Sequence, residues 1–451
     1  MDIAAFFAAE VKPALGCTEP GAVALAAATA ARHLPGPPER IHLRLSANIY
    51  KNGQSVGIPG AQGLRGNMLA SALGALAGDA DMGLQALAAV TASDVAAARA
   101  LTERGSVTQE IVQDVPTVYA EAELYRPGHL VVAVVAGRHD RVAEVRHNGQ
   151  VVYRAEDALG GDSLPPYTAD LQRAAFDDLW AWADGIDADL ARDLLRGAEM
   201  NLAVAEQGLA SPWGLAVGHT LGMALRGGDC PSSCAPDTSA LGSCVTGDRI
   251  SDACGPDISA RVKATTAAAA DVRMAGANQP VMSSAGSGNH GLTAIIPPAL
   301  AARAWGRSDA ELARALALSH LVTGAVKART GRLTPLCGCA VAAGAGAAAA
   351  LVRLADGTPA QAEQAVALVF SSVMGMICDG AKGGCALKVG TAAAEAWSAA
   401  QLALHGPGMT GAEGIVSPDF RASLRSLGEV SSLGFAAVDV AIIRLLERGV
   451  Q

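Results

Sequence analysis

The hydrophobic pattern of this chain changes near residue 170. Before that point, segments such as residues 40–50 alternate apolar and polar side chains with a period of two, which is typical of half-buried strands. Beyond it, apolar residues recur with helical spacing. A chain of 451 residues also exceeds what one hydrophobic core usually supports, so two domains are expected. The sequence therefore predicts an α+β protein.

The first predicted domain covers residues 1–165 and is an α/β domain with antiparallel strands. Helices are expected at residues 1–10 and 21–33, and a loop that approaches a ligand or another backbone at residues 51–66. Further strands are expected at residues 117–125, 130–136 and 141–147. Asn148–Gly149 is a dipeptide typical of hairpin turns.

The second predicted domain covers residues 166–451 and is mainly all-α. Ser308 with Glu311, and Thr358 with Gln361, have the spacing of helix capping boxes. Residues 162–167, with two prolines, are the expected linker. A long loop is expected at residues 227–255. It contains four cysteines that either bind a structural metal or are incidental, namely Cys230, Cys234, Cys244 and Cys254.

Composition limits the classes of partner. Hydrophobic residues make up 51% and charged residues 17%, which favours a folded chain. The formal net charge of −9 argues against a nucleic-acid partner. The most apolar stretch, residues 336–352, is mostly Ala and Gly and is short for a bilayer, and charged residues near the start argue against an export signal. We therefore expect a cytoplasmic protein without a membrane partner; a homo-oligomer is an open alternative.

The nine cysteines are an odd number, and a chain in a reducing compartment does not need disulfides. Five of them lie in glycine-rich segments: Cys17, Cys337, Cys339, Cys378 and Cys385. Thiolates hold iron–sulfur clusters, and nearby glycine lets backbone N–H groups approach the sulfides. A cluster held by only three cysteines leaves one iron open as a Lewis acid. The alternative is that these residues are small buried hydrophobes, because no spacing here is that of a ferredoxin or a zinc finger.

Five segments carry a resemblance to a known family. They are EVKPALGCTEP at 10–20, SANIYKNGQSVGIPG at 46–60, PVMSSAGSGNHGLTAIIP at 280–297, KARTGRLTPLCGCAVAAG at 327–344 and GMICDGAKGGCALK at 375–388. In this order they resemble the L-cysteine desulfidase family, which is related to the iron–sulfur L-serine dehydratases. The resemblance covers nearly the whole chain.

The resemblance implies a [4Fe–4S] cluster. We expect no pyridoxal phosphate, because lysines are scarce and none lies in a phosphate-binding context; the alternative rests on the loop at residues 286–291, which superficially resembles a phosphate-binding cup. By position in the segments, Cys339, Cys378 and Cys385 are the expected ligands, and Cys337 stays an alternative to Cys339. Cys17 is expected at the substrate, as a base or a temporary fourth ligand. Glu19, beside Cys17, is expected either to orient groups or accept a proton at the substrate. The alternative is that its carboxylate only complements the dipole at the start of the following helix.

Substrate-binding residues follow from the same resemblance. The loop with Ser287, Gly288 and Asn289 is expected to offer backbone N–H groups and an amide to a carboxylate, at the N-terminus of a helix. Asn48 and Lys51 are further candidates, with a solvated lysine as the alternative for Lys51. His290 stands where the family usually has Gln, so the pH dependence of this position would differ.

These expectations describe an α,β-elimination on a small β-substituted L-amino acid. L-cysteine would yield pyruvate, ammonia and hydrogen sulfide, and L-serine would react by the same chemistry. The other hypotheses are a cluster-based redox sensor and a non-catalytic amino-acid binding protein.

Overall fold

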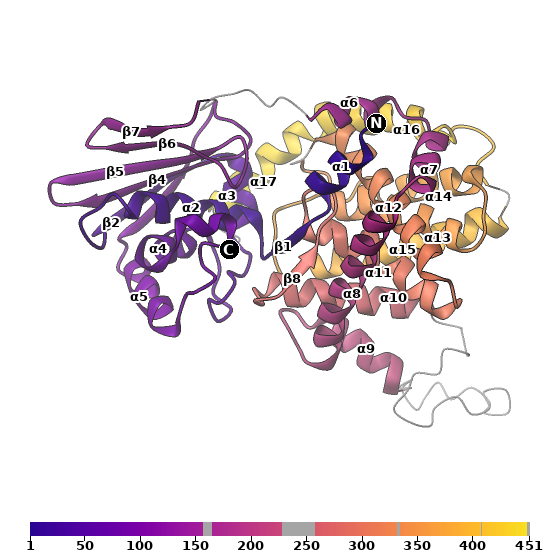
Figure 1. Ribbon diagram of the computed structural model, residues 1–451, viewed down its shortest axis with the longest axis horizontal. Coiled ribbons are helices and arrows are strands. Elements are labelled where there is room, and N and C mark those ends of the chain that lie inside the picture. The colour runs from indigo at the N-terminus through magenta and orange to yellow at the C-terminus, as the bar shows by residue number, and fades with distance from the viewer. Residues whose placement is uncertain (157–164, 228–257, 332–333, 407, 449–451) are drawn as a thin grey trace.

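The computed structural model describes residues 1–156, 165–227, 258–331, 334–406 and 408–448. Figure 1 shows a part built on a β-sheet beside a larger helical part. The predicted α+β class is confirmed. The cysteines between residues 230 and 254, and residues 162–164 of the expected linker, lie outside the described residues.

The sheet has six strands in the order β3-β2-β4-β5-β6-β7. Their bounds are β2 (Arg40–Leu45), β3 (Val107–Ile111), β4 (Tyr119–Arg126), β5 (His129–Ala136), β6 (Val142–His147) and β7 (Gln150–Arg154). Of these six described strands, β2 and β3 pair in parallel and the other neighbours pair antiparallel. The predicted antiparallel strands are thus present, and Asn148–Gly149 joins β6 to β7.

Helices cover one face of this sheet. They are α2 (Thr18–Ala31), α3 (Ala47–Gly53), α4 (Asn67–Ala77) and α5 (Ala92–Glu103), with the short η1 (Ala80–Gln85) beside them. Alternate strand residues such as Leu43, Leu124 and Val131 point into the core under α2 and α4. This follows from the period of two that the sequence displays.

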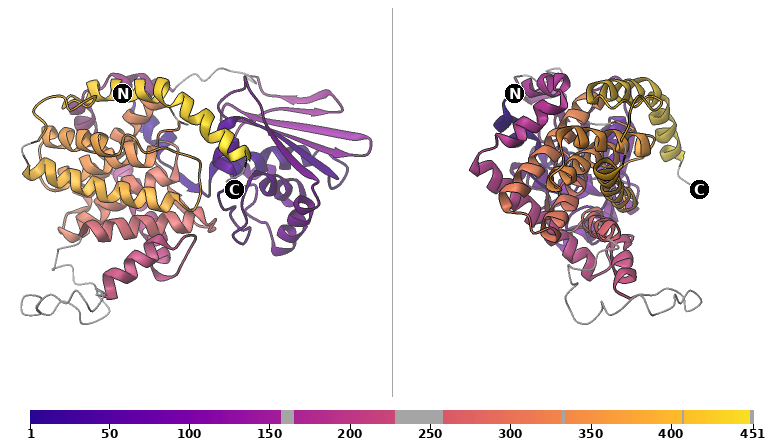
Figure 2. Two further views of the ribbon diagram at one scale, coloured as in Figure 1. Left: turned by 180° about the vertical axis from the view of Figure 1, so that it is seen from behind. Right: turned by 90° about the vertical axis from the view of Figure 1, so that its right-hand side faces the viewer.

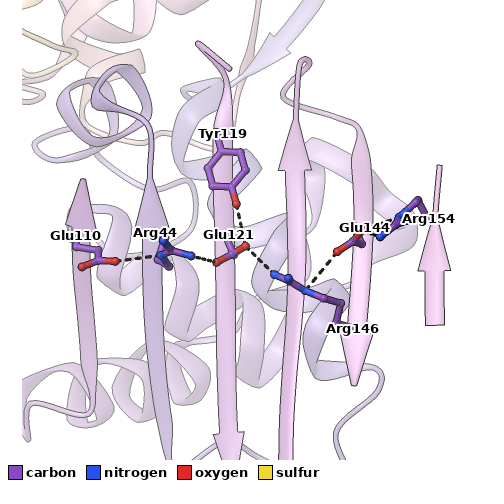
Figure 3. Close-up of polar contacts among 7 residues, drawn as sticks. All are labelled: Arg44, Glu110, Tyr119, Glu121, Glu144, Arg146 and Arg154. Carbon is purple, nitrogen blue, oxygen red and sulfur yellow. Dashed lines mark hydrogen bonds and ion pairs between the residues drawn. The ribbon is translucent and has the colours of Figure 1, made fainter. Parts of the chain in front are cut away.

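The other face of the sheet carries a row of charged side chains (Figure 3). At its centre, Glu121 is only 2% exposed and accepts hydrogen bonds from Arg44 and Arg146 at 3.0 Å each. Tyr119 donates its hydroxyl to the same carboxylate at 2.8 Å. Charged side chains therefore line the face of these strands opposite α2 and α4.

The helical part consists of closely packed helices and one short strand. Its elements are α6 (Pro166–Arg173), α7 (Phe176–Asp184), α8 (Ala188–Ala210), α9 (Val217–Gly227), α10 (Ile258–Met274), β8 (Pro280–Met282), α11 (Gly288–Ala304), α12 (Asp309–Thr330), η3 (Cys339–Ala343), α13 (Gly344–Leu354), α14 (Pro359–Val373), α15 (Cys385–His405), α16 (Phe420–Glu429), η4 (Val430–Gly434) and α17 (Ala436–Arg448). Both predicted capping boxes are present. Small residues permit the close packing: a Cβ on Gly346 would lie 2.3 Å from the Ser319 carbonyl oxygen. No described helix is both long and apolar enough to span a membrane.

Both chain ends join the two parts. The N-terminal α1 (Ile3–Glu10) buries Phe6 and Phe7 in the helical core, and β1 (Pro13–Leu15) pairs antiparallel with β8. Helix α17 runs back from the helical part and contacts α3 beside the sheet (Figures 1 and 2). A domain boundary at residue 165 stays a proposal.

The predicted strand over residues 40–50 is wrong in its second half. Strand β2 ends at Leu45, and α3 begins at Ala47. Ser46 is the N-cap: its hydroxyl oxygen accepts from the Ile49 N–H at 3.4 Å and donates to the Thr117 carbonyl at 2.8 Å. A local cap thus overrides the alternating pattern.

Candidate active site

Two chain segments run side by side and bring cysteines together. The Cys337 N–H donates to the Met376 carbonyl at 2.9 Å, and the Cys378 N–H donates to the Pro335 carbonyl at 2.5 Å. The antiparallel bridge between Leu336 and Ile377 completes this pairing. Cys337 and Cys378, far apart in sequence, are therefore held next to each other by backbone hydrogen bonds.

Cys339 and Cys385 lie at the first positions of η3 and α15. The Cys339 thiol acts on Cys337 as a hydrogen-bond donor, which lowers the pKa of Cys337 to about 6. Burial raises the pKa of Cys385 to about 11, and the pKa of Cys378 also rises because of burial and then because of Cys337. Each of the four thiols thus lies within electrostatic reach of others in the group.

Lysines surround this group, which we call the thiol cluster (Cys337, Cys339, Cys378 and Cys385). Lys388 Nζ lies 2.7 Å from Asp379 Oδ1, and Lys382 pairs with the same carboxylate. Burial works to raise the pKa of Asp379, but these two ammonium groups lower it to about 2. The positive charges of Lys51 and Lys388 also favour the thiolate of Cys378.

The loop between Cys378 and Cys385 contacts the sheet part directly. Ser55 forms a parallel bridge with Lys382. Gly380 has a φ of +99°, and a Cβ there would lie 2.3 Å from the Lys51 carbonyl oxygen. The thiol cluster therefore lies where the two parts of the molecule meet.

Cys17 belongs to the same junction. It occupies the N-cap position of α2, and its Sγ donates to Glu19 Oε2 at 3.2 Å. Asn52 Nδ2 donates to the other oxygen of Glu19 at 3.2 Å, which fixes this buried carboxylate. Burial, then the charge of Glu19, raises the pKa of Cys17 well above its ordinary value, and Cys385 contributes in the same direction. Cys17 is therefore a neutral thiol in contact with a carboxylate and near the thiol cluster.

The segment predicted to bind a carboxylate lies at the N-terminus of α11, which begins at Gly288. Ser287 is its N-cap and makes no side-chain capping bond. Asn289 and His290 follow in the first turn and are buried. The His290 ring packs against Gly338, between Cys337 and Cys339: a Cβ on that glycine would lie 2.4 Å from Nε2. Burial, then Lys327, lowers the pKa of His290 to about 3, so its imidazole is neutral.

Arg273, at the end of α10, was not among the predicted site residues. Its Nη1 donates to Asn289 Oδ1 at 2.9 Å, and its Nη2 donates to the Gly16 carbonyl at 2.6 Å. Arg273 thereby connects the Cys17 loop with the α11 loop. The sequence does contain one signal for it. Residues 264–274 are Ala-rich, and a charged residue in so apolar a helix is commonly buried with a specific partner.

The two candidates on α3 have different surroundings. Lys51 is buried, not solvated, and its Nζ lies 2.5 Å from Asp439 Oδ1 on α17. Asn48 is half-buried, and its Oδ1 is buried without a hydrogen-bond partner among the described residues. Lys51 thus forms an ion pair with a carboxylate of the protein, whereas the side-chain oxygen of Asn48 can still accept a hydrogen bond.

The donor set of the thiol cluster fits an iron–sulfur cluster. Thiolates are the ligands that such clusters require, and the lysines offset their negative charge. The Gly380 and Lys382 N–H groups favour the thiolates of Cys378 and Cys385, respectively. Among the described residues, no three His, Cys, Asp or Glu side chains form a site for a single metal ion.

Known proteins are similar to this chain over most or all of its length. The family model for the serine dehydratase alpha chain matches residues 81–444. A UPF0597 protein of Nitratidesulfovibrio vulgaris (strain DSM 19637 / Miyazaki F) is 95% identical over 451 residues, which is 100% of both chains. Another from the same species (strain DP4) is 51% identical over 469 residues, again 100% of both chains. UPF0597 protein YhaM of Escherichia coli (strain SMS-3-5 / SECEC) is 36% identical over 439 residues, covering 97% of this chain and 94% of its own. The chain therefore belongs to the serine dehydratase alpha chain family, which points to a lyase of the serine dehydratase type.

Proposed function

We propose that this protein catalyses an iron–sulfur-dependent α,β-elimination on a small β-substituted L-amino acid, with L-cysteine as substrate. L-serine is the alternative. The observation that carries the proposal is the meeting of the thiol cluster with the Cys17–Glu19 pair at one junction. The balanced reaction converts L-cysteine and water into pyruvate, ammonia and hydrogen sulfide.

Cys378 and Cys385, together with Cys339 or Cys337, would hold a [4Fe–4S] cluster. Such a cluster with one iron free of protein ligands supplies a Lewis acid for the substrate carboxylate and the β substituent. The ammonium groups of Lys51, Lys382 and Lys388 balance the negative charge of the thiolates. Sulfide suits iron as a leaving group, which favours cysteine over serine.

Cys17 is the proposed base for the α proton. Its S–H points to Glu19, so the carboxylate can take the thiol proton and leave a thiolate. Burial opposes that thiolate, while the charge of Arg273 favours it. The thiolate then accepts the proton from Cα as the β substituent departs. The resulting enamine becomes an imine, and water releases pyruvate and ammonia.

The substrate carboxylate is proposed to lie at the N-terminus of α11. The first N–H groups of a helix have no partner within the helix and favour an anion. Ser287 and Gly288 would offer their backbone N–H groups, and Asn289 its amide. Asn48 offers a free acceptor to the α-ammonium group.

The test is anaerobic turnover of the iron-reconstituted protein with L-cysteine and with L-serine. Sulfide and pyruvate would be measured together with visible absorption. We expect equal amounts of both products from cysteine, and loss of absorption and turnover in Cys378→Ala and Cys385→Ala. Cys17→Ser should keep the absorption and lose turnover.

The remaining outcomes separate the alternatives. Pyruvate from serine alone keeps the mechanism and changes the substrate. Comparison of Cys337→Ala with Cys339→Ala assigns the third ligand, because only the ligand variant should lose absorption. A coloured protein without turnover favours a redox sensor, and a colourless, iron-free protein favours an amino-acid binding protein.

A further inference from the structure

Arg273 is a buried charge without a counter-ion. The residue is 5% exposed, and no carboxylate within the described part of the chain pairs with it. Its known acceptors, the Asn289 amide oxygen and the Gly16 carbonyl, are both neutral. Its Nε is also buried and donates no hydrogen bond to a described residue. Burying a charge is costly unless an opposite charge compensates it, so this site calls for an anion.

The guanidinium lies against the start of α11. A Cβ on Gly288 would lie 2.4 Å from Arg273 Nε, so only glycine permits this approach. Helix α11 has 17 residues, and its N-cap Ser287 gives the first turn no side-chain acceptor. A helix N-terminus and an arginine fork are both favourable partners of a carboxylate. Two independent features therefore point to the same kind of ligand.

The Cys17 thiol does not supply the missing charge. Its Sγ donates its hydrogen to Glu19 Oε2 at 3.2 Å, so the thiol is engaged with that carboxylate and offers no negative charge to Arg273. The Gly16 carbonyl, which Arg273 holds, immediately precedes Cys17. An anion bound at Arg273 therefore lies close to the proposed base.

We propose that Arg273 and the first turn of α11 bind the α-carboxylate of the substrate, and that this charge pairing restricts the enzyme to amino acids with a free carboxylate. This inference rests on the proposed function. Asn289 Oδ1 and the Gly16 carbonyl hold the guanidinium in place by one N–H each, and its other N–H groups remain for the ligand. Arg273 is then a substrate-binding residue that also selects the substrate class.

The experiment compares L-alanine with L-alaninamide. Neither has a β leaving group, so both bind without reaction, and they differ in the negative charge. Calorimetry on the anaerobic, iron-reconstituted protein should show tighter binding of L-alanine. Arg273→Gln should reduce this preference by roughly 10- to 100-fold, the usual range for a hydrogen bond to a charged group. An undiminished preference in Arg273→Gln overturns the proposal.

Two further variants serve as a substitute and as a control for Arg273→Gln. Gly288→Ala keeps Arg273 but displaces its guanidinium from the N-terminus of α11, so this variant should also lose the preference for L-alanine. Gly288→Ala takes the place of Arg273→Gln if the latter does not fold. Arg303→Gln, an exposed arginine near the other end of α11, is the matched control and should retain the full preference. Loss of preference in Arg303→Gln as well would attribute the effect to overall charge and overturn the proposal.

Failure of this inference is separate from failure of the proposed function. If the wild-type protein turns over cysteine or serine but Arg273→Gln keeps its carboxylate preference, only the assignment of Arg273 fails. If the wild-type protein shows an Arg273-dependent preference for L-alanine but forms no pyruvate, the proposed elimination fails and the carboxylate site stands.

Discussion

The ammonium nitrogen of Lys51 lies 2.5 Å from Asp439 Oδ1, although the residues are 388 positions apart in sequence. Lys51 is on α3 beside the thiol cluster, and Asp439 is on α17, of which Ile442 is the buried residue. The Lys51 side chain is 1% exposed and the Asp439 side chain 24%. This ion pair therefore joins the C-terminal helix to the candidate active site.

Asp439→Asn should destabilise the protein. The variant removes the carboxylate that pairs with the buried ammonium of Lys51, and breaking a buried pair typically costs ~3–5 kcal/mol. Because Asp439 is partly exposed and water can replace it, we expect about 2 kcal/mol. Chemical unfolding followed by circular dichroism measures the change. The matched control is Glu103→Gln, which breaks the exposed Arg99–Glu103 pair and should leave the unfolding midpoint unchanged. Equal midpoints for both variants would contradict the prediction.

Glu121→Gln should destabilise the sheet part moderately. The carboxylate joins Arg44, Arg146 and Tyr119 on the charged face of the sheet (Figure 3). Both arginines are more than one third exposed and can turn to water, so we expect only about 1–2 kcal/mol. Tyr119→Phe removes one hydrogen bond and should cost about 1 kcal/mol. The double variant should cost less than the sum, because the residues share one contact. Strict additivity of the unfolding free energies would show that they act independently.

His320 should make the protein less stable in acid. It is fully buried, shares a 2.8 Å hydrogen bond with Ser284, and burial lowers its pKa from 6.5 to about 3. Between pH 6.5 and about pH 3, His320 therefore binds a proton in the unfolded chain but stays neutral in the folded protein. Stability contributed by the neutral ring is present above pH 6.5 and is lost as the pH falls towards 3, with a slope of up to ~1.4 kcal/mol per pH unit.

His320→Gln should flatten that dependence, whatever it does to stability at neutral pH. The measurement is the free energy of unfolding between pH 7 and pH 4. The exposed His405 provides the control, because His405→Gln should leave the slope as in the wild type. An unchanged slope in His320→Gln would show that the buried ring is protonated in the folded protein.

Strands with one buried and one charged face were predictable from sequence. The expected strands at residues 117–125, 130–136 and 141–147 agree with β4, β5 and β6 within two residues at each end. The alternation of apolar and polar residues indicates directly which face of a strand is buried, so local sequence is enough to predict these strands. At Ser46 it does not suffice, because the hydroxyl binds Ile49 and Thr117 and begins a helix inside an apparently continuous strand.

The candidate site was predictable only as separate pieces. Glycine-rich surroundings drew attention to Cys17, Cys339 and Cys378, and those thiols lie at one junction. What brings them together is long-range: the Arg273–Gly16 hydrogen bond spans 257 residues. No periodicity or spacing predicts such a contact, so the partners of Arg273 and Lys51 became visible only in the fold.

Gly380→Ala should disrupt the site more than an ordinary glycine substitution does. Gly380 has a φ of +99°, and the new Cβ would lie 2.3 Å from the Lys51 carbonyl oxygen, a backbone atom that cannot rotate away. Gly63 is the matched control: its φ is +82°, but nothing lies within 4 Å of its Cβ position. Gly63→Ala thus measures the backbone strain alone, about 1 kcal/mol, with iron binding retained. Gly380→Ala should show a larger loss of unfolding free energy and should also lose visible absorption after reconstitution, because the displaced loop carries Cys378 and Cys385. Equal unfolding free energies for the two variants, with full absorption in both, would show that contact with Lys51 does not shape the thiol cluster.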